Sequence, residues 1–221
     1  IIWYFIDSLE KSIKRARTSE ASMIATYDHT LAGWVKALEY RDKETEEHSK
    51  RVVEMTIRLA HAMKVDEANI EHYRRGALLH DIGKLTIPDC ILLKKSSLTE
   101  EEMEIMRRHP LIAGEMLSSI GFLAPAIEIP VYHHEHWDGT GYPYGLKSEQ
   151  IPFAARLFAV VDSWEALGSQ RAYRPAWTQE MIIQYLVENK GVLFDPNVVD
   201  AFLPLIQAED GVRRANLNSV K

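Results

Sequence analysis

Apolar residues recur every three or four positions along most of this chain, which is the spacing that one face of an α-helix requires. The first such segment spans residues 8 to about 40, contains no proline, and has Gly33 as its only glycine. A polar run at 40–48 interrupts the pattern, and a second helix is expected from there to about Met63. The long first segment predicts either a connector or dimer-forming stalk, or a helix that packs on its own domain.

Capping residues mark the next helices. Asp66 is a candidate N-cap for a helix that runs to His80. Thr99 and Glu102 match the capping-box pattern and predict a helix that opens there and runs towards His109.

Further apolar periodicity predicts helices over the rest of the chain, at about 110–120, 125–134, 153–167, 178–189 and 196–207. Pro130 is a candidate kink in the second of these. Residues 136–152 are rich in glycine, proline and aromatic residues, which predicts a loop. No alternation typical of β-strands is sustained and no internal repeat occurs, so the fold class expected is all-α.

Composition and charge narrow the class of protein. A chain of 221 residues has room for one large domain and an appendage, and 46% hydrophobic with 26% charged residues is ordinary for a soluble globular protein. A net charge of −6 argues against nucleic-acid binding, which needs a basic surface. It leaves room for a small anionic ligand in a locally positive pocket.

The cysteine content and the first residues of the chain indicate the cellular setting in which the protein is expected to work. Cys90 is the only cysteine, so no disulfide forms within the chain and no cysteine-based zinc site exists, which favours a reducing, cytoplasmic setting. The apolar run at 1–6 is too short to span a bilayer and lacks a signal-peptide pattern, so no membrane contact by this segment is expected. Because the chain does not begin with methionine, we expect an excerpt of a longer protein with a sensor domain upstream.

A histidine and an aspartate stand next to each other after the apolar run 77–79. His80 and Asp81 are both good metal ligands, and neighbouring positions can face two adjacent ions. Gly83 is expected to let the chain leave the helix in the left-handed conformation, and Lys84 places a positive charge one turn from the acid. Alone, such a doublet also fits a capping or hydrogen-bonding pair at a helix end.

Six further candidate ligands lie in other segments, namely Glu44, His48, His109, His133, His134 and Asp162. Helices of a bundle can each contribute one or two inward groups to a shared site. Glu44 and His48 are four residues apart and share one helix face. Asp162 follows the apolar run 157–161, and a buried carboxylate needs a cationic partner, either a metal or an Arg or Lys side chain.

The chemistry of this donor set indicates which metals it suits. Five imidazoles and three carboxylates without a thiolate favour Fe or Mn, with Zn, Ni and Co as further candidates. Eight donors exceed the need of one ion but suit two or three, with Asp81 as a bridge. Two ions roughly 3.5–4 Å apart suit in-line attack on phosphorus, because they supply hydroxide at neutral pH and neutralise phosphate charge. His29, His61 and His72 match no such pattern and are expected at the surface or in packing.

A longer, ordered set of motifs carries a resemblance to a known family. The set comprises Glu44-Thr45, His48-Ser49, Arg51-Val52, Leu79 to Lys84, His109-Pro110, His133-His134-Glu135, Asp138 to Pro143, Asp162, Arg171, Tyr173-Arg174 and Phe194-Asp195-Pro196. From Tyr40 to Leu205 the chain resembles the HD-GYP domain, a bacterial branch of the HD metal-dependent phosphohydrolases. The resemblance implies an HD-type helical bundle at 40–221 with a Gly/Pro-rich GYP loop, preceded by a connector or dimerisation helix at 1–39.

The resemblance also implies a reaction, the hydrolysis of the second messenger cyclic di-GMP to pGpG or on to GMP. It implies that a metal pair is held by His80, Asp81, His109, His133, His134 and Asp162, with His48 adding a ligand. Glu44 then favours a third ion. Lys84 is expected to act beside Asp81 by stabilising the equatorial phosphate oxygens as negative charge develops.

Substrate and partner contacts follow from the same resemblance. Arg171 and Arg174 are expected to grip the second phosphate, because a planar guanidinium makes bidentate contacts. Tyr142 is expected to stack on guanine or to hydrogen-bond a phosphate, although a tyrosine that merely packs the loop is the alternative. The loop at 141–143 is also a candidate surface for a GGDEF-type or other signalling partner.

Two positions depart from the family pattern. Many relatives have an aspartate where this chain has Glu165, which lengthens an acidic arm near the metals and Lys84. They also often read Asp-Arg-Pro-Tyr-Arg at 170–174, where this chain has lost a charge and a backbone constraint. Three readings therefore stay open: a cyclic di-GMP phosphodiesterase, a phosphodiesterase for cyclic GMP-AMP or pGpG, and a weakly active cyclic-dinucleotide sensor or interaction module.

Overall fold

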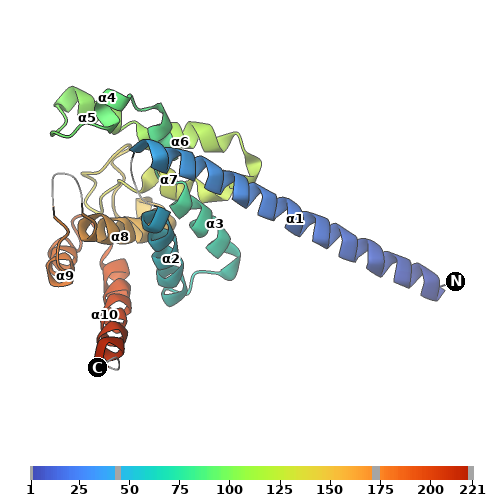
Figure 1. Cartoon of the computed structure of the whole chain (residues 1–221). Helices are drawn as coiled ribbons and strands as arrows, with labels where there is room; N and C mark the ends of the chain where they lie inside the picture. Colours follow the sequence, from blue (N-terminus) through green and yellow to red (C-terminus); the bar gives the residue numbers. More distant parts are fainter. Residues whose placement is uncertain (1, 43–45, 171–174, 219–221) are drawn as a thin grey trace.

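The protein is a bundle of helices, turns and loops (Figure 1). The computed structural model describes residues 2–42, 46–170 and 175–218, and no strand occurs within these ranges, which confirms the all-α class. None of the helices in these ranges is both long and apolar enough to cross a membrane. The elements are α1 (Ile2–Asp42), α2 (Glu46–Ala62), α3 (Glu67–Leu78), η1 (Ile82–Thr86), α4 (Asp89–Leu92), α5 (Glu100–Met106), α6 (His109–Ser118), η2 (Gly121–Ala126), α7 (Glu128–Tyr132), η3 (Ser148–Gln150), α8 (Phe153–Gly168), α9 (Gln179–Glu188) and α10 (Pro196–Asn218).

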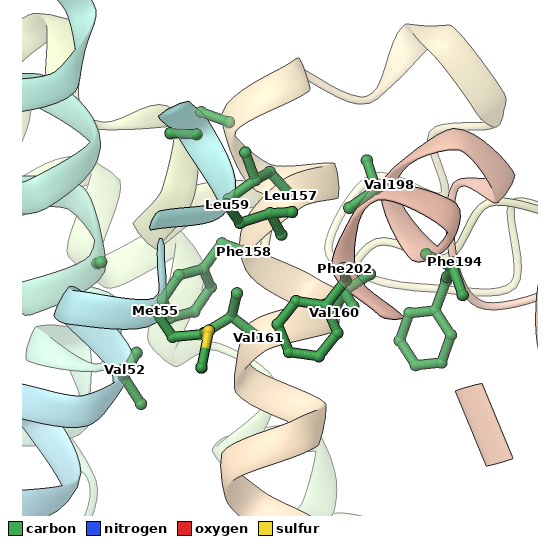
Figure 2. Close-up of a cluster of buried hydrophobic side chains, with 14 of the residues drawn as sticks. Val52, Met55, Leu59, Leu157, Phe158, Val160, Val161, Phe194, Val198 and Phe202 are labelled. Carbon is green, nitrogen blue, oxygen red and sulfur yellow. The ribbon is translucent and has the colours of Figure 1, made fainter. Parts of the chain in front are cut away.

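Helix α8 is the centre of the main hydrophobic core (Figure 2). It is apolar on most of its surface, and such a helix is stable only when other elements cover it. Its Phe158 and Val161 are fully buried, together with Leu59 of α2 and Phe202 of α10. Since each such side chain stabilises the fold by about 1.5–3 kcal/mol, this packing fixes the helix that carries Asp162.

Helix α1 has two parts with different surroundings. Residues 8–27 are exposed, and this part of the helix extends away from the rest of the molecule (Figure 1). Further along, Leu31 and Val35 are buried in a second core cluster that includes Leu79 and Ile82. The end of α1 therefore packs directly beside the His80-Asp81 doublet, whereas its start has no neighbour in the described chain.

Asp28 lies between the two parts of α1 and connects this helix to helix α3. Its carboxylate accepts a hydrogen bond from Nε of Arg75 at 2.8 Å and lies 2.7 Å from Nη2 of Arg74. Burial alone would raise the pKa of Asp28, but the hydrogen bond from Arg75 and the charges of both arginines lower it overall. The group is therefore ionised and paired at neutral pH.

We expect Asp28→Asn to lower the free energy of unfolding by about 1–3 kcal/mol at pH 7, because the buried Arg75 loses the carboxylate that accepts its hydrogen bonds and is left with the longer contact to Glu71 at 3.6 Å. The folded pKa of Asp28 lies below its ordinary value of 3.8, so its contribution is present above that pH and is lost as pH falls through the folded pKa. Urea unfolding at pH 7 and pH 3 measures both effects. Asp7→Asn, in an exposed pair with Lys11 at 2.7 Å, is the matched control and is expected to change little; equal effects of the two substitutions would contradict the assignment.

The predicted caps are confirmed. The Asp66 side chain accepts a hydrogen bond from Ala68 N at 3.1 Å at the start of α3. Thr99 and Glu102 form a reciprocal capping box at the start of α5, with Glu102 N donating to Thr99 at 3.3 Å and Thr99 N donating to Glu102 at 2.8 Å. Local hydrogen bonding of this kind depends on nearest neighbours, so it is readable from sequence.

Three predicted helices are wrong in their extent. The last, expected over 196–207, continues to Asn218 as α10. Helix α3 ends at Leu78, so His80 lies in a turn instead of at the end of the helix. The helix expected over 125–134 is also absent as such: Pro125 belongs to the 3₁₀ helix η2, and α7 is a short helix over Glu128–Tyr132. Pro130 does not kink α7, because it lies in the first turn, where its missing N–H leaves no intrahelical hydrogen bond unmade.

Candidate metal centre

Asp81 presents its two carboxylate oxygens to two different histidines. Its Oδ2 lies 3.1 Å from Nε2 of His80, and its Oδ1 lies 3.4 Å from Nε2 of His109. The ammonium of Lys84 donates to Oδ2 at 2.5 Å. Asp81 therefore stands between two imidazoles, as a bridging carboxylate does between two ions.

Three histidines form one half of the centre. Ring nitrogens of His109, His133 and His134 all lie within 4.8 Å of one another. His109 is the first residue of α6, and the other two follow directly after α7. The contact between α6 and α7 thus brings together donors that are 24 residues apart in the sequence.

Hydrogen bonds to the backbone orient these rings. The Nδ1 atoms of His80, His109 and His133 lie 2.8, 2.8 and 3.1 Å from carbonyl oxygens three or four residues earlier in the chain. Because a carbonyl only accepts, each Nδ1 carries the proton and each neutral ring has a lone pair on Nε2. Nε2 of His109 and Nε2 of His133 are 3.4 Å apart, so two lone pairs face each other unless a cation lies between them. This orientation by outer hydrogen bonds is the usual one for metal-bound histidines.

The electrostatics favour neutral imidazoles. Burial lowers the pKa of His109 and lowers that of His134 to about 3, and burial with the neighbouring histidines holds the pKa of His133 well below its usual range. Burial alone would raise the pKa of Asp81, but Lys84 and His80 bring it well below its usual value. At neutral pH the cluster therefore offers neutral imidazoles and an ionised carboxylate, which is the form that binds a divalent ion.

The other half of the centre lies on the His80 side. Burial and the charge of Asp81 raise the pKa of Asp162, while His80, His48 and Lys84 lower it, so the electrostatic surroundings of Asp162 include all four groups. This raised value follows from confining two carboxylates in one buried site, and it falls when a cation binds. Among the described residues, Lys84 is a candidate for the Arg or Lys alternative, because its charge acts on Asp162, and its ammonium is hydrogen-bonded to Asp81.

Glu165, the first departure from the family pattern, is buried one turn after Asp162. Its Oε2 accepts a hydrogen bond from Nε of Arg51 at 2.9 Å and lies 4.0 Å from Nδ1 of His48. Arg51 therefore holds this carboxylate beside the outer nitrogen of His48. At 4.0 Å Glu165 is too far from His48 for a hydrogen bond, so it places a negative charge near this candidate ligand.

Gly83 serves a different purpose from the one expected. It has no positive φ and lies within η1 (Ile82–Thr86). A Cβ at this position would lie 2.0 Å from the backbone oxygen of His109 and 2.9 Å from the backbone nitrogen of Ala113. Glycine is needed here because η1 packs backbone to backbone against the start of α6, and this approach brings Asp81 to His109.

The GYP loop folds back onto the histidines. A Cβ on Gly141 would lie 2.2 Å from the backbone nitrogen of His136, so only glycine fits there. Tyr142 N donates to the carbonyl oxygen of His134 at 3.0 Å, and the two rings stack with centroids 4.7 Å apart. Burial raises the pKa of Tyr142, so its hydroxyl stays protonated and can donate.

Glu135 organises this loop, a role that sequence reasoning missed. The side chain is 2% exposed, and its carboxylate accepts hydrogen bonds from Tyr144 N at 2.7 Å and from Leu146 N at 2.9 Å. A glutamate next to two histidines reads as a further ligand or as a surface acid. Its partners are backbone groups nine and eleven residues away, which no local pattern reveals.

The structure brings together His48, His80, Asp81, Lys84, His109, His133, His134, Tyr142 and Asp162. Glu44, Arg171 and Arg174 lie outside the described residues. His29 and His61 are exposed and His72, on α3, is half-buried, as expected for surface or packing histidines.

Comparisons with known proteins identify a family and several similar chains. Residues 34–198 match the family model described as HD domain. The chain is 40% identical over 203 residues to the cyclic di-GMP phosphodiesterase response regulator RpfG of Xanthomonas campestris, covering 87% of this chain and 54% of that protein. It is 38% identical to a cyclic di-GMP phosphodiesterase of Thermotoga maritima, covering 91% and 56%, and 39% identical to the 3'3'-cGAMP-specific phosphodiesterase 2 of Vibrio cholerae, covering 76% and 32%. The chain thus spans about half the length, or less, of these relatives.

Solved structures share the fold at low sequence identity. Bd1817, an HDG"Y"P protein from Bdellovibrio bacteriovorus, superposes with a TM-score of 0.61 at 19% identity, over 75% of this chain and 53% of that one. The cyclic GMP-AMP phosphodiesterase V-cGAP3 of Vibrio cholerae also gives 0.61, at 17% identity, over 80% and 48%. At such identities the likeness concerns the helical fold.

Proposed function

The chain belongs to the HD domain family, and on that premise we propose that it is a metal-dependent phosphodiesterase of the HD-GYP branch that hydrolyses cyclic di-GMP to pGpG or GMP. The observation that supports this most is the geometry of Asp81, whose two oxygens face His80 and His109 separately. A carboxylate so placed suits two ions close together. Two ions close together suit attack on a phosphodiester.

The proposed ligands divide into two sets around Asp81. His109, His133 and His134 would hold one ion, and His80, Asp162 and His48 would hold the other. We propose Fe or Mn, with Zn, Ni and Co as further candidates for this nitrogen and oxygen donor set. The bound ions supply a nucleophile at neutral pH and neutralise charge on the phosphate.

Lys84 and Tyr142 are the described residues that we propose act on the substrate. The Lys84 ammonium, next to Asp81, stabilises the equatorial phosphate oxygens as negative charge develops. Because the Tyr142 ring already stacks on His134, a hydrogen bond from its hydroxyl to phosphate is the simpler of its two expected roles. Arg171 and Arg174 remain the proposed contacts to the second phosphate.

Glu44 is the proposed ligand of a third ion. Glu44→Ala is expected to lower the metal content from about three ions per chain to about two, because only this carboxylate is lost. Elemental analysis of the metal-loaded protein measures the change. Glu47→Ala, an exposed acid three residues further along, is the control; the same content in Glu44→Ala and the parent would exclude the third ion.

The projecting part of α1 is the proposed dimerisation segment. Ile6, Leu9 and Ile13 are 49%, 50% and 45% exposed, and their spacing of three and four residues places them in one row, as in a coiled coil. Ile13→Lys is expected to shift the mass measured by light scattering from two copies to one. Ser8→Lys, which adds the same charge away from this row, is expected to leave the mass unchanged; a dimer that persists in Ile13→Lys would contradict the proposal.

Substrate choice is the second part of the proposal, since one relative is named for a cyclic GMP-AMP. Equal concentrations of cyclic di-GMP, cyclic GMP-AMP and pGpG are offered together to the metal-loaded chain, and the products are separated by chromatography. We expect cyclic di-GMP to be consumed first. If cyclic GMP-AMP or pGpG is consumed faster, that nucleotide would replace cyclic di-GMP as the proposed substrate. If none of the three nucleotides is consumed, the result would favour a sensor or interaction module. Such a module would work in the cytoplasm, with a GGDEF-type or other signalling partner bound at the GYP loop.

A further inference from the structure

Arg41, in the last turn of α1, donates hydrogen bonds to the backbone segment that carries Lys84. Its Nη1 donates to the carbonyl oxygens of Lys84 at 3.2 Å and Leu85 at 2.7 Å, and its Nη2 donates to that of Ile87 at 2.5 Å. Its Nε donates to the Asp89 carboxylate at 2.9 Å. One guanidinium thus contacts three carbonyls and one acid within six residues of the chain.

Leu85 lies in the last turn of the 3₁₀ helix η1, which ends at Thr86, and the last carbonyls of a helix lack partners within it. The Lys84 carbonyl also accepts a hydrogen bond from Ile87 N at 3.0 Å, and Ile87 itself follows η1. A basic side chain at such an end supplies the missing hydrogen bonds. Arginine is suited to this place because its planar fork directs several N–H groups at once, whereas the single ammonium of lysine cannot reproduce the fork.

The segment that Arg41 grips leads directly to the metal centre. The backbone oxygen of Lys84 accepts from Arg41, and the Lys84 ammonium donates to Asp81 at 2.5 Å. We propose that Arg41 is a positioning residue for Lys84 and that it transmits the position of α1 to the centre. This inference rests on the proposed function for the role of Lys84, whereas the hydrogen bonds from Arg41 to the backbone are independent of that function.

A second connection links the same helix to the other end of the segment. Leu31 and Val35 of α1 pack in the cluster that contains Leu79 and Ile82, the residues that flank the His80-Asp81 doublet. A rotation or shift of the projecting part of α1 (Figure 1) would therefore reach the doublet through this packing and Lys84 through Arg41. The two connections hold the segment 79–87 against one helix.

The first test compares Arg41→Ala and Arg41→Lys with the parent chain, loaded with Mn. Both variants are expected to lower kcat for cyclic di-GMP about 10- to 100-fold, as small misplacements of catalytic groups do, with metal content and KM nearly unchanged. Amide hydrogen exchange over residues 82–88 is expected to be faster in both. Arg17→Ala, an exposed arginine on the projecting part of α1, is the matched control and should change none of these.

The second test asks whether Arg41 acts through Lys84. In a Lys84→Met background, Arg41→Ala is expected to cost no further activity, because the group that it positions is gone. An equal loss in both backgrounds, or unchanged exchange over 82–88, would overturn the proposal. The exchange measurement needs no substrate. A parent chain without turnover would therefore refute the proposed function, while the exchange data would still test whether Arg41 stabilises the backbone segment.

Discussion

Asp81→Ala is expected to abolish hydrolysis of cyclic di-GMP, with a fall in kcat well beyond the roughly 10- to 100-fold loss typical of outer partners of metal ligands. The reason is that Asp81 is shared: one oxygen faces His80 and the other faces His109. Its removal takes a ligand from both halves of the centre at once. Metal content should fall together with activity, and His80→Ala should likewise abolish turnover by removing a ligand from one half.

Elemental analysis and product formation, measured on the same preparations, test this prediction. Urea unfolding shows whether each variant is folded, which matters because Asp81 also pairs with Lys84. Asp200→Ala removes an exposed aspartate paired with Lys190 and is expected to keep full activity and metal. Near-normal turnover in Asp81→Ala or His80→Ala would show that the ligand assignment is wrong.

Lys84→Met is expected to lower kcat by about 10²- to 10³-fold while the metal content stays the same. Methionine keeps most of the side-chain volume but lacks the charge that meets the phosphate oxygens in the transition state. Because Lys84 is not a ligand, activity and metal content should separate in this variant, unlike in Asp81→Ala. This separation distinguishes an electrostatic catalyst from a residue that supports the metals.

The control for this prediction is Lys94→Met, which removes a lysine that is paired with Glu102 at 2.5 Å and is not among the proposed site residues. It should leave kcat unchanged. If Lys84→Met were as active as Lys94→Met, Lys84 would have no part in catalysis. Arg41 would then have no catalytic residue to position, although its hydrogen bonds to the backbone would be unaffected.

Features set by neighbouring residues were the most predictable part of the fold. The Asp66 cap, the Thr99-Glu102 capping box and the apolar helix α8 all follow from interactions within one or two helical turns. The grouping of His109, His133 and His134 was predictable for another reason, since these residues belong to the ordered motifs that carry the resemblance to the HD-GYP family. Each of these signals is carried by residue type and short spacing.

Features set by distant contacts were not predictable in the same way. The turn that holds His80, and the true reason for Gly83, depend on the approach of η1 to the start of α6. Glu135 is explained only by backbone groups of the loop that folds over it. The grip of Arg41 joins residues that are 43 to 48 positions apart. Such contacts depend on the packing of whole elements and leave no periodic trace in the sequence.

The most direct test of the central claim is turnover of cyclic di-GMP by the purified chain after anaerobic loading with Fe or Mn. The bound metal is counted first, and product is then followed by chromatography. We predict at least about two ions per chain, as a shared bridging carboxylate requires, and conversion of cyclic di-GMP to pGpG or GMP that stops when the metal is removed. A chain that holds two or more ions and yields no product would contradict the account.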